Sequence, residues 1–484
     1  VPYPVESELS GIRESVKPED FLWYQRTFEI PEEWNGKRVI LHFDAVDYAC
    51  TVWLNDRLIS EHKGGYLPFS VDISDDVKEK NRLTVCVSDP TDSAFQQRGK
   101  QSLHPRGIFY TPCSGIWQTV WLEAVAEHHI TSLKMTPDTD TSSLLLTVYS
   151  NVEENCTVEV YDREKKMVMQ KVIPANRETA LLLDDMHLWS TEDPYLYDLR
   201  ITMEEDTVES YFGMRKYGLK SENGRKVLTL NGEKIFHLGV LDQGYWPESN
   251  LTPVSEEAMV FDITELKQLG FNTIRKHIKI EPLYWYYLCD KLGMIVWQDM
   301  VAGGNAKIFV DIYVKNFLHI PIDDTSVRSL KAAGRESEAV REEFEEQYKG
   351  MIEHLYNSVS IACWVPFNEY WGQYNAAYFA ELTKELDPTR YVDHTSGWVD
   401  MKKGAFASYQ QYFKKLALPK DLDERVFVIS ECGGFGYIAK GHTSDEKVFS
   451  YGKFKTQEKL DERYRRFIEE EVLPLKEHGL SALI

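Results

Sequence analysis

Hydrophobic and polar positions alternate along the first part of the chain, which is typical of β-strands with one buried face. Strand-like segments rich in β-branched and aromatic residues lie at residues 23–30, 38–43 and 50–55. Asn-Gly, Asn-Asp and Gly-Gly pairs, which favour tight turns, separate such segments. This pattern predicts a β-sandwich over residues 1–124.

The next part of the chain also contains strand-like segments, but they are shorter. Examples are the alternating or apolar segments at residues 143–148 and 197–202. Their number and spacing suit an immunoglobulin-like β-sandwich. We therefore predict a second, immunoglobulin-like sandwich over residues 125–220.

After residue 221 the pattern changes to strand, helix, strand. Ser255 is a suitable N-cap for a helix that ends at Leu269-Gly270, and a β-branched strand follows directly. Eight strand-like segments can be counted, at residues 238–240, 271–275, 294–299, 359–365, 391–393, 405–409, 427–430 and 480–484. Alternating elements of this kind predict a parallel (β/α)8 TIM barrel over residues 221–484.

Two of these apolar strands run directly into a glutamate. Residues 359–365 lead into Pro366-Phe367-Asn368-Glu369, and residues 426–429 lead into Ser430-Glu431. Most of the 77 acidic residues of the chain are expected to be solvated surface charges. A carboxylate at the C-terminal end of a barrel strand differs, because barrels keep their chemistry at that end. Two such carboxylates can face each other across one sugar ring.

Net charge and cysteine content limit which kinds of partner and which cellular compartment we expect. The formal net charge of −22 argues against nucleic acid and anionic membrane as partners, and no 18-residue apolar stretch is present to span a bilayer. The seven cysteines are scattered without Cys-x-x-Cys spacing, so we expect neither a disulfide framework nor structural zinc. A reducing compartment follows, which favours a cytoplasmic over a secreted location. Because no start methionine is present, we expect the first sandwich to be N-terminally incomplete, and likewise the barrel C-terminally incomplete.

The order of these features resembles glycoside hydrolase family 2, which includes β-galactosidases, β-glucuronidases and β-mannosidases. The resemblance covers almost the whole chain. It rests on the order sandwich, immunoglobulin-like domain, barrel and on five short motifs, at residues 107–117, 212–215, 231–233, 364–369 and 429–431. In such proteins the first sandwich is a sugar-binding-like jelly roll. A glycoside or oligosaccharide substrate and possible homo-oligomerisation are implied.

The resemblance also implies a reaction and its two carboxylates. Retaining hydrolysis of a glycosidic bond needs one carboxylic acid that protonates the leaving oxygen and one carboxylate that attacks the anomeric carbon, about 5 to 5.5 Å apart. By resemblance, Glu369 is the acid/base and Glu431 the nucleophile. Asn368 matches the family residue that hydrogen-bonds the sugar 2-hydroxyl. Tyr412 falls where the family has a tyrosine bound to the nucleophile, although Tyr409 competes for this role.

Other polar or aromatic residues near the predicted strand ends are candidates for binding the sugar. Arg275 offers a positive charge for the nucleophile. The remaining candidates are expected to bind hydroxyl groups or to stack on the sugar, with a structural role as the alternative for each: Asp242, His277, Asp299, His394, Trp371 and Trp398.

For the function we expect a retaining exo-β-glycosidase, with β-galactosidase as the first choice. No Asn-x-Lys triplet, with which glucuronidases hold the substrate carboxylate, follows Glu431. Where large β-galactosidases carry a magnesium-binding Asp-Glu pair, this chain has Trp297-Gln298-Asp299, so we expect no metal and no cofactor. β-Glucuronidase and β-mannosidase remain alternatives within the family. A carbohydrate-binding protein without catalysis is the alternative from another class.

Overall fold

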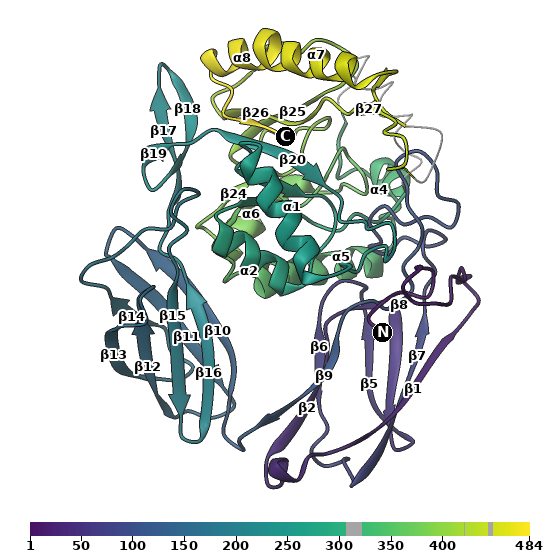
Figure 1. Cartoon of the computed structure of the whole chain (residues 1–484), viewed down its shortest axis with the longest axis vertical. Helices are drawn as coiled ribbons and strands as arrows, with labels where there is room; N and C mark the ends of the chain where they lie inside the picture. The colour runs from purple at the N-terminus through teal and green to yellow at the C-terminus, as the bar shows by residue number, and fades with distance from the viewer. Residues whose placement is uncertain (306–321, 421, 444–448) are drawn as a thin grey trace.

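Two β-sandwiches lie side by side below a mixed α/β unit in the computed structural model of the chain (Figure 1). The structure describes residues 1–305, 322–420, 422–443 and 449–484. The N-terminal sandwich is drawn in purple, the second sandwich in blue and teal, and the α/β unit in green to yellow.

The N-terminal sandwich consists of antiparallel strands. A four-stranded sheet of order β1-β7-β4-β5 faces a three-stranded sheet of order β6-β2-β9, and β3 pairs with β8. Buried and less buried residues alternate along β2 and β4, as the sequence pattern predicts. The strands are β1 (Leu22–Glu29), β2 (Arg38–Phe43), β3 (Val46–Asp47), β4 (Ala49–Leu54), β5 (Arg57–Lys63), β6 (Phe69–Asp72), β7 (Lys80–Ser88), β8 (Gly115–Ile116) and β9 (Val120–Val125), with a short helix at Glu32–Trp34.

The second sandwich packs a three-stranded sheet of order β10-β11-β14 against a four-stranded sheet of order β13-β12-β15-β16. Its core is a separate cluster of apolar side chains from both sheets. The strands are β10 (Ile130–Asp138), β11 (Ser143–Ser150), β12 (Asn155–Tyr161), β13 (Met167–Pro174), β14 (Thr179–Leu182), β15 (Tyr197–Met203) and β16 (Asp206–Phe212).

A small three-stranded sheet connects this sandwich to the α/β unit. It consists of β17 (Tyr217–Glu222), β18 (Arg225–Leu230) and β19 (Glu233–Lys234). Tyr217 and Leu230 pack with Trp297, Phe406 and Ile484, whose side chains come from the barrel. This sheet therefore extends the barrel core (Figure 1, upper left).

The α/β unit is a nearly closed parallel barrel, which confirms the predicted fold class. Its sheet order is β24-β23-β22-β21-β20-β29-β26-β25, so the eighth strand joins the first to the seventh. All eight strands predicted from the sequence are present. They are β20 (His237–Asp242), β21 (Thr273–Lys276), β22 (Ile295–Asp299), β23 (Ile361–Val365), β24 (Tyr391–Val392), β25 (Phe406–Gln411), β26 (Val426–Cys432) and β29 (Ala482–Leu483).

Helices cover the barrel, and the first of them begins where the sequence predicts. The Ser255 side chain accepts a hydrogen bond from the Ala258 amide and so caps α1. One connection differs from a regular (β/α)8 barrel: residues 393–405 turn from β24 to β25 without a helix, and these two strands do not pair. The elements around the barrel are α1 (Glu256–Gln268), α2 (Leu283–Leu292), α4 (Val327–Ala333), α5 (Glu338–Leu355), α6 (Ala376–Leu386), α7 (Gln457–Phe467), the π-helix Ile468–Val472 and α8 (Leu473–Glu477), with β27 (Phe435–Tyr437) paired to β28 (Gly452–Phe454).

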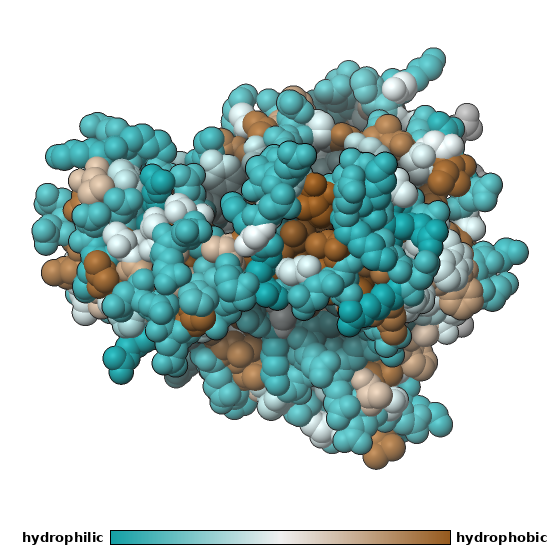
Figure 2. All heavy atoms as spheres, turned by 90° about the horizontal axis from the view of Figure 1, so that it is seen from below, coloured by the Kyte–Doolittle hydropathy of each residue, from teal (hydrophilic) through white to brown (hydrophobic). Residues whose placement is uncertain are grey.

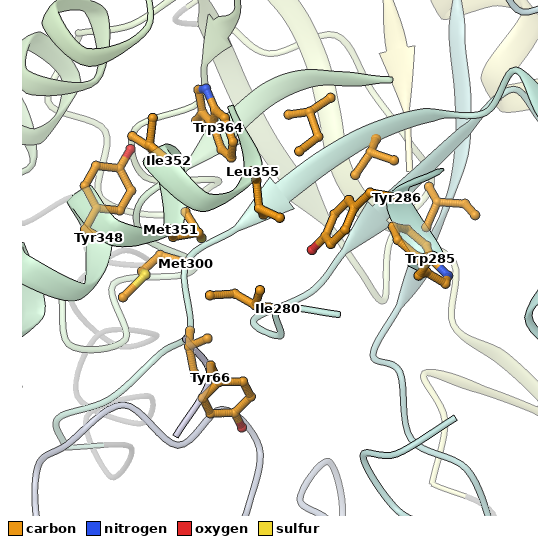
Figure 3. Packing of buried hydrophobic residues seen from close by; sticks show 14 of the residues in the cluster. Tyr66, Ile280, Trp285, Tyr286, Met300, Tyr348, Met351, Ile352, Leu355 and Trp364 are labelled. Carbon is orange, nitrogen blue, oxygen red and sulfur yellow. The ribbon is translucent and has the colours of Figure 1, made fainter. Parts of the chain in front are cut away.

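The N-terminal sandwich and the barrel share one apolar core. Tyr66 and Trp117 of the sandwich belong to the same buried cluster as Ile280 and Met300 of the barrel. Figure 3 shows Tyr66 on the sandwich ribbon, next to Ile280 and Met300. The face of the molecule seen in Figure 2 is mostly hydrophilic, with apolar residues in small separate areas. In the described residues, no helix has the length and apolar character that crossing a membrane requires.

The contact between the second sandwich and the barrel makes a testable prediction at Gly293. This glycine ends α2 with φ of 73°, and a Cβ there would lie 2.6 Å from the Thr191 carbonyl oxygen. We expect Gly293→Ala to lower the thermal unfolding midpoint through both a left-handed backbone penalty, roughly 1 to 2 kcal/mol, and this clash.

Gly224→Ala is the matched control, because Gly224 has φ of 76° but no atom within 4 Å of a built Cβ. It reports the backbone penalty alone. Equal losses of stability in the two variants would contradict the proposed close approach of Thr191 to α2.

Candidate active site

One buried arginine joins four strand ends at the C-terminal edge of the barrel. Arg275, at the end of β21, donates from Nε and Nη2 to the two carboxylate oxygens of Asp299, each at 2.9 Å. Its Nη1 lies 3.1 Å from Glu431 Oε1, and its Nη2 lies 2.7 Å from Asn368 Oδ1. Burial lowers the pKa of this guanidinium, but Asp299 and Glu431 outweigh burial and the net shift is upward. Arg275 therefore stays charged and fixes three candidate residues.

Glu431 is buried and bound at both oxygens. Oε1 accepts from Arg275, and Oε2 accepts from the Tyr412 hydroxyl at 2.6 Å. Both oxygens of this carboxylate are therefore held in place by donors at the ends of two different strands of the barrel. Burial and the charge of Glu431 raise the pKa of Tyr412, so the phenol keeps its proton and donates. Tyr412, one of the two competing tyrosines, thus contacts Glu431.

The loop after β23 holds Asn368 and Glu369. Arg275 and Gln410 both donate to Asn368 Oδ1, at 2.7 and 3.1 Å, which leaves the amide nitrogen of Asn368 as a donor. Glu369 and Tyr370 have φ of 51° and 68°, a left-handed backbone that side-chain-bearing residues seldom adopt. Strained backbone of this kind is concentrated at functional sites.

An aromatic cluster holds the start of this loop in place. Phe367 packs with Phe344 and Phe379, whose ring centroids both lie 5.2 Å away, and Tyr374 lies at 5.8 Å. The anchored ring restrains the chain immediately before Asn368 and Glu369. The two residues are thus presented by a rigid segment.

The surroundings of Glu369 favour its protonated form. Burial first and the negative charge of Glu431 second raise the pKa of Glu369 to about 8, while the positive charges of Lys100 and Arg275 act in the opposite direction. The surroundings of the two carboxyl groups therefore differ: Glu431 accepts hydrogen bonds at both oxygens, whereas burial raises the pKa of Glu369. Two carboxyl groups whose surroundings move their pKa values apart can serve as acid and nucleophile.

Asp299 and His277 form part of the same group. Burial raises the pKa of Asp299 to about 6 against the opposing charge of Arg275, so Asp299 is an anion at neutral pH. His277 Nδ1 lies 2.7 Å from Asp299 Oδ2. Burial and the charge of Lys100 hold the pKa of His277 well below its usual range. The ring is therefore neutral, with Nδ1 donating to Asp299.

Asp242 lies on the neighbouring strand end in a second charged group. It accepts from Lys276 Nζ at 2.6 Å, and Lys276 also donates to Glu281 at 2.8 Å. Burial raises the pKa of Asp242, but the charge of Lys276 outweighs it and the net shift is downward. Its side chain is 32% exposed, so it can still reach a bound molecule.

Like Asp242, three further predicted residues have their described contacts with groups other than the two glutamates. His394 Nε2 lies 3.2 Å from Asp400 Oδ1 and accepts from the Met401 amide. Trp371 is 2% exposed and packs in a cluster with Ile278 and Ala302. Trp398 packs beside a different small cluster.

A cleft of about 660 Å³ opens next to Glu431, and its lining includes residues that the sequence did not single out. Lys100 comes from the N-terminal sandwich, and Tyr451 stacks on Tyr412 with ring centroids 4.1 Å apart. Gln410, which holds Asn368, was also missed. Gln410 follows a predicted strand, which is a usable signal, but no local pattern indicates Lys100.

One group of side chains in the described residues has the spacing of a metal site. His128, Glu154 and Glu204 have ligand atoms within 4.8 Å of one another on the second sandwich, distant in sequence from the barrel. His128 Nδ1 already lies 3.1 Å from Glu204 Oε2. Exposed histidine and carboxylate side chains pair in this way without an ion, and the group takes no part in the site above.

Family profiles match most of the chain. A profile described as "Glycosyl hydrolases family 2, sugar binding domain" matches residues 1–124. A second, "Glycosyl hydrolases family 2", matches residues 128–215, and a third, "Glycosyl hydrolases family 2, TIM barrel domain", matches residues 223–432. All three belong to the same family and follow in the same order.

Individual relatives are distant. A β-glucuronidase from Streptococcus agalactiae is 23% identical over 80% of this chain and 66% of its own length. A β-galactosidase from Clostridium acetobutylicum is 25% identical over 77% of this chain and 40% of its own length. The chain thus spans less than two thirds of these relatives.

Solved structures share the fold. A Ruminococcus gnavus β-glucuronidase superposes with a TM-score of 0.76 at 19% identity, covering 100% of this chain and 84% of that one. An uncultured Clostridium sp. β-glucuronidase gives 0.75 at 20% identity, with coverage of 100% and 84%.

The raised pKa of Glu369 can be tested by titration. We expect the Glu369 carboxyl carbon to titrate near pH 8 in carbon-13 NMR of glutamate-labelled protein. In Glu431→Gln the pKa of Glu369 should fall, because the negative charge that disfavours its ionisation is gone. Glu369→Gln assigns the resonance. An unchanged pKa in Glu431→Gln would show that the two carboxyl groups do not interact.

Proposed function

The chain belongs to glycosyl hydrolase family 2, and on this premise we propose that it is a retaining exo-β-glycosidase, with Glu369 as acid/base and Glu431 as nucleophile. The observation that carries the proposal is the different environment of the two glutamates. Glu369 has its pKa raised to about 8, whereas Glu431 accepts from Arg275 and Tyr412. Retaining hydrolysis requires this division of roles.

The reaction proceeds in two displacements. In the first, Glu431 attacks the anomeric carbon while Glu369 gives its proton to the departing glycosidic oxygen, and a covalent glycosyl-enzyme forms. In the second, Glu369, now a carboxylate, takes a proton from water, which attacks the same carbon and releases Glu431. Arg275 and Tyr412 hold the carboxylate of Glu431 before the attack and receive it again afterwards.

Asn368 is proposed to bind the sugar 2-hydroxyl. Because Arg275 and Gln410 occupy its carbonyl oxygen, the amide nitrogen is the group that remains for the substrate. A hydrogen bond to the 2-hydroxyl strengthens as the transition state forms, so it contributes to catalysis as well as to binding. Asp242 is proposed to accept from another hydroxyl group of the same sugar.

For the glycone, we place a β-galactoside first. A β-glucuronide is the second candidate, because the cleft beside Glu431 contains the ammonium group of Lys100. The distant relatives include proteins named for each of these two activities.

Aryl glycosides test the function. We expect the wild type to hydrolyse a 4-nitrophenyl β-glycoside from a panel of galactoside, glucoside, mannoside and glucuronide, with retention of configuration by proton NMR. Glu431→Ala should lower kcat by at least about 10⁴-fold, the scale on which loss of a nucleophile acts. Glu369→Ala should lower it by roughly 10² to 10⁴-fold, the usual contribution of a general acid or base.

The matched control is Glu353→Ala, a surface glutamate on α5, which should keep wild-type kcat. Saturable sugar binding without turnover on any member of the panel would favour a carbohydrate-binding protein instead. Inversion of configuration would contradict the assigned roles.

The pH dependence gives a separate test of Glu369. Only its protonated form can donate, so kcat/KM for a phenyl β-glycoside should fall as the pH rises through about 8. A 2,4-dinitrophenyl glycoside, whose leaving group needs little protonation, should show a weaker decline over the same range. An alkaline decline centred at pH 6 or below would exclude Glu369 as the acid.

A further inference from the structure

A loop of the N-terminal sandwich crosses to the barrel and carries Lys100 into the cleft. The Arg98 and Gly99 amides donate to the Ala302 carbonyl oxygen at 3.0 and 2.9 Å, and Arg98 Nη2 donates to the Gly304 carbonyl oxygen at 3.1 Å. These hydrogen bonds join the sandwich loop to the segment that follows β22. Lys100 is therefore held by the barrel although it belongs to another domain.

The approach of this loop depends on a glycine. Gly99 has φ of 62°, and a Cβ there would lie 3.0 Å from the Ile278 carbonyl oxygen and 3.2 Å from the Tyr66 hydroxyl. A larger residue would separate the loop from the segment after β21. The following carbonyl, that of Lys100, accepts from the Tyr110 amide at 2.9 Å. The backbone on both sides of Lys100 is thus fixed.

The side chain of Lys100 is largely buried beside Glu431. It is 8% exposed and lines the cleft together with Glu431 and Tyr412. The charges that act most on its ammonium are those of Glu431 and then Glu369. Within the described ranges, however, no hydrogen bond or ion pair of its Nζ is found, although an ammonium group has three hydrogens to donate.

Lys100 Nζ is not among the fully buried polar atoms that lack a partner in the described residues, so the ammonium group still reaches the solvent of the cleft. A ligand that enters the cleft can replace this water as the acceptor of its hydrogen bonds. The same cleft is lined by Glu431, the proposed nucleophile, next to which the glycone must bind. Burial also lowers the pKa of Lys100, in agreement with an incompletely satisfied charge.

We propose that Lys100 is a substrate-binding residue that donates hydrogen bonds to oxygen atoms of the glycone. The inference rests on the proposed glycosidase function and specifies its sugar site further. The acceptor is either a hydroxyl oxygen of a neutral sugar or a carboxylate oxygen of a uronic acid. Both supply the same hydrogen-bonding chemistry, and the two are separated by experiment.

The test compares Lys100→Met, Lys100→Arg and the control Arg106→Met, which removes an exposed cation of the same loop. The substrates are 4-nitrophenyl β-galactoside and 4-nitrophenyl β-glucuronide. For the substrate that the wild type prefers, Lys100→Met should lower kcat/KM by about tenfold or more, the scale of a charge-assisted hydrogen bond. Lys100→Arg should recover part of the loss, and Arg106→Met should stay within about twofold of wild type.

The identity of the acceptor follows from which substrate is affected. A loss larger for the glucuronide than for the galactoside assigns a carboxylate oxygen, and a loss confined to the galactoside assigns a hydroxyl oxygen. Either result supports the proposal. Wild-type kcat/KM in Lys100→Met for both substrates, or an equal loss in Arg106→Met, overturns it.

Two readouts separate this inference from a purely structural role and from failure of the proposed function. Because methionine removes a largely buried charge, Lys100→Met should unfold at the wild-type temperature or above; a lower unfolding midpoint with unchanged sugar binding overturns the proposal.

Binding of the non-hydrolysable phenyl β-thiogalactoside and phenyl β-thioglucuronide is measured calorimetrically. Weaker binding by Lys100→Met supports the proposal even if the wild type turns over no substrate. A shift of the pH profile with unchanged thioglycoside affinity overturns it.

Discussion

The organisation of the cleft depends on one buried charge, the guanidinium of Arg275. It contacts side chains that come from β22, from the loop after β23 and from β26, and it also donates to the Ser430 carbonyl oxygen at 3.1 Å. A planar group with five donors can satisfy several acceptors at fixed angles, which a lysine cannot do. Because removing one partner from such a buried group leaves the others uncompensated, the arrangement is restrained as a unit. The positions of Asn368 and Glu431 relative to each other follow from this restraint.

Much of the barrel could be predicted from the sequence because its signals are local. Apolar runs such as residues 361–365 and 426–430 are buried strands, and the polar residues that follow them lie at one edge of the sheet. The Ser255 cap and the contact of Tyr412 with Glu431 were predicted in the same way, the latter by family resemblance. The division of the chain into two sandwiches and a barrel also follows from the change of hydrophobic period, from two residues to alternating strands and helices.

The remaining features depend on tertiary structure. His394 was expected at a strand end facing the sugar, but β24 has only two residues and the chain then turns, so the ring pairs with Asp400. Trp371 follows two left-handed residues, which direct it into a packed interior. Lys100 lies on a connection of a different domain, and no local pattern states which cavity such a loop reaches. The sugar specificity has the same origin, because it depends on groups that meet only in the folded chain.

The position of β29 between β20 and β26 has a consequence for how the protein is made. On the ribosome, both neighbours of this strand are synthesised before it, and they are not joined to each other until Ala482–Leu483 insert and hydrogen-bond to each side. Until then β26, the strand that carries Glu431, lacks one edge partner, and exposed edges of this kind promote aggregation. The sandwich that bears Tyr66 is complete much earlier and can offer its apolar surface to the growing barrel. Nascent chains of this protein therefore have a long interval in which protection by a chaperone is most valuable.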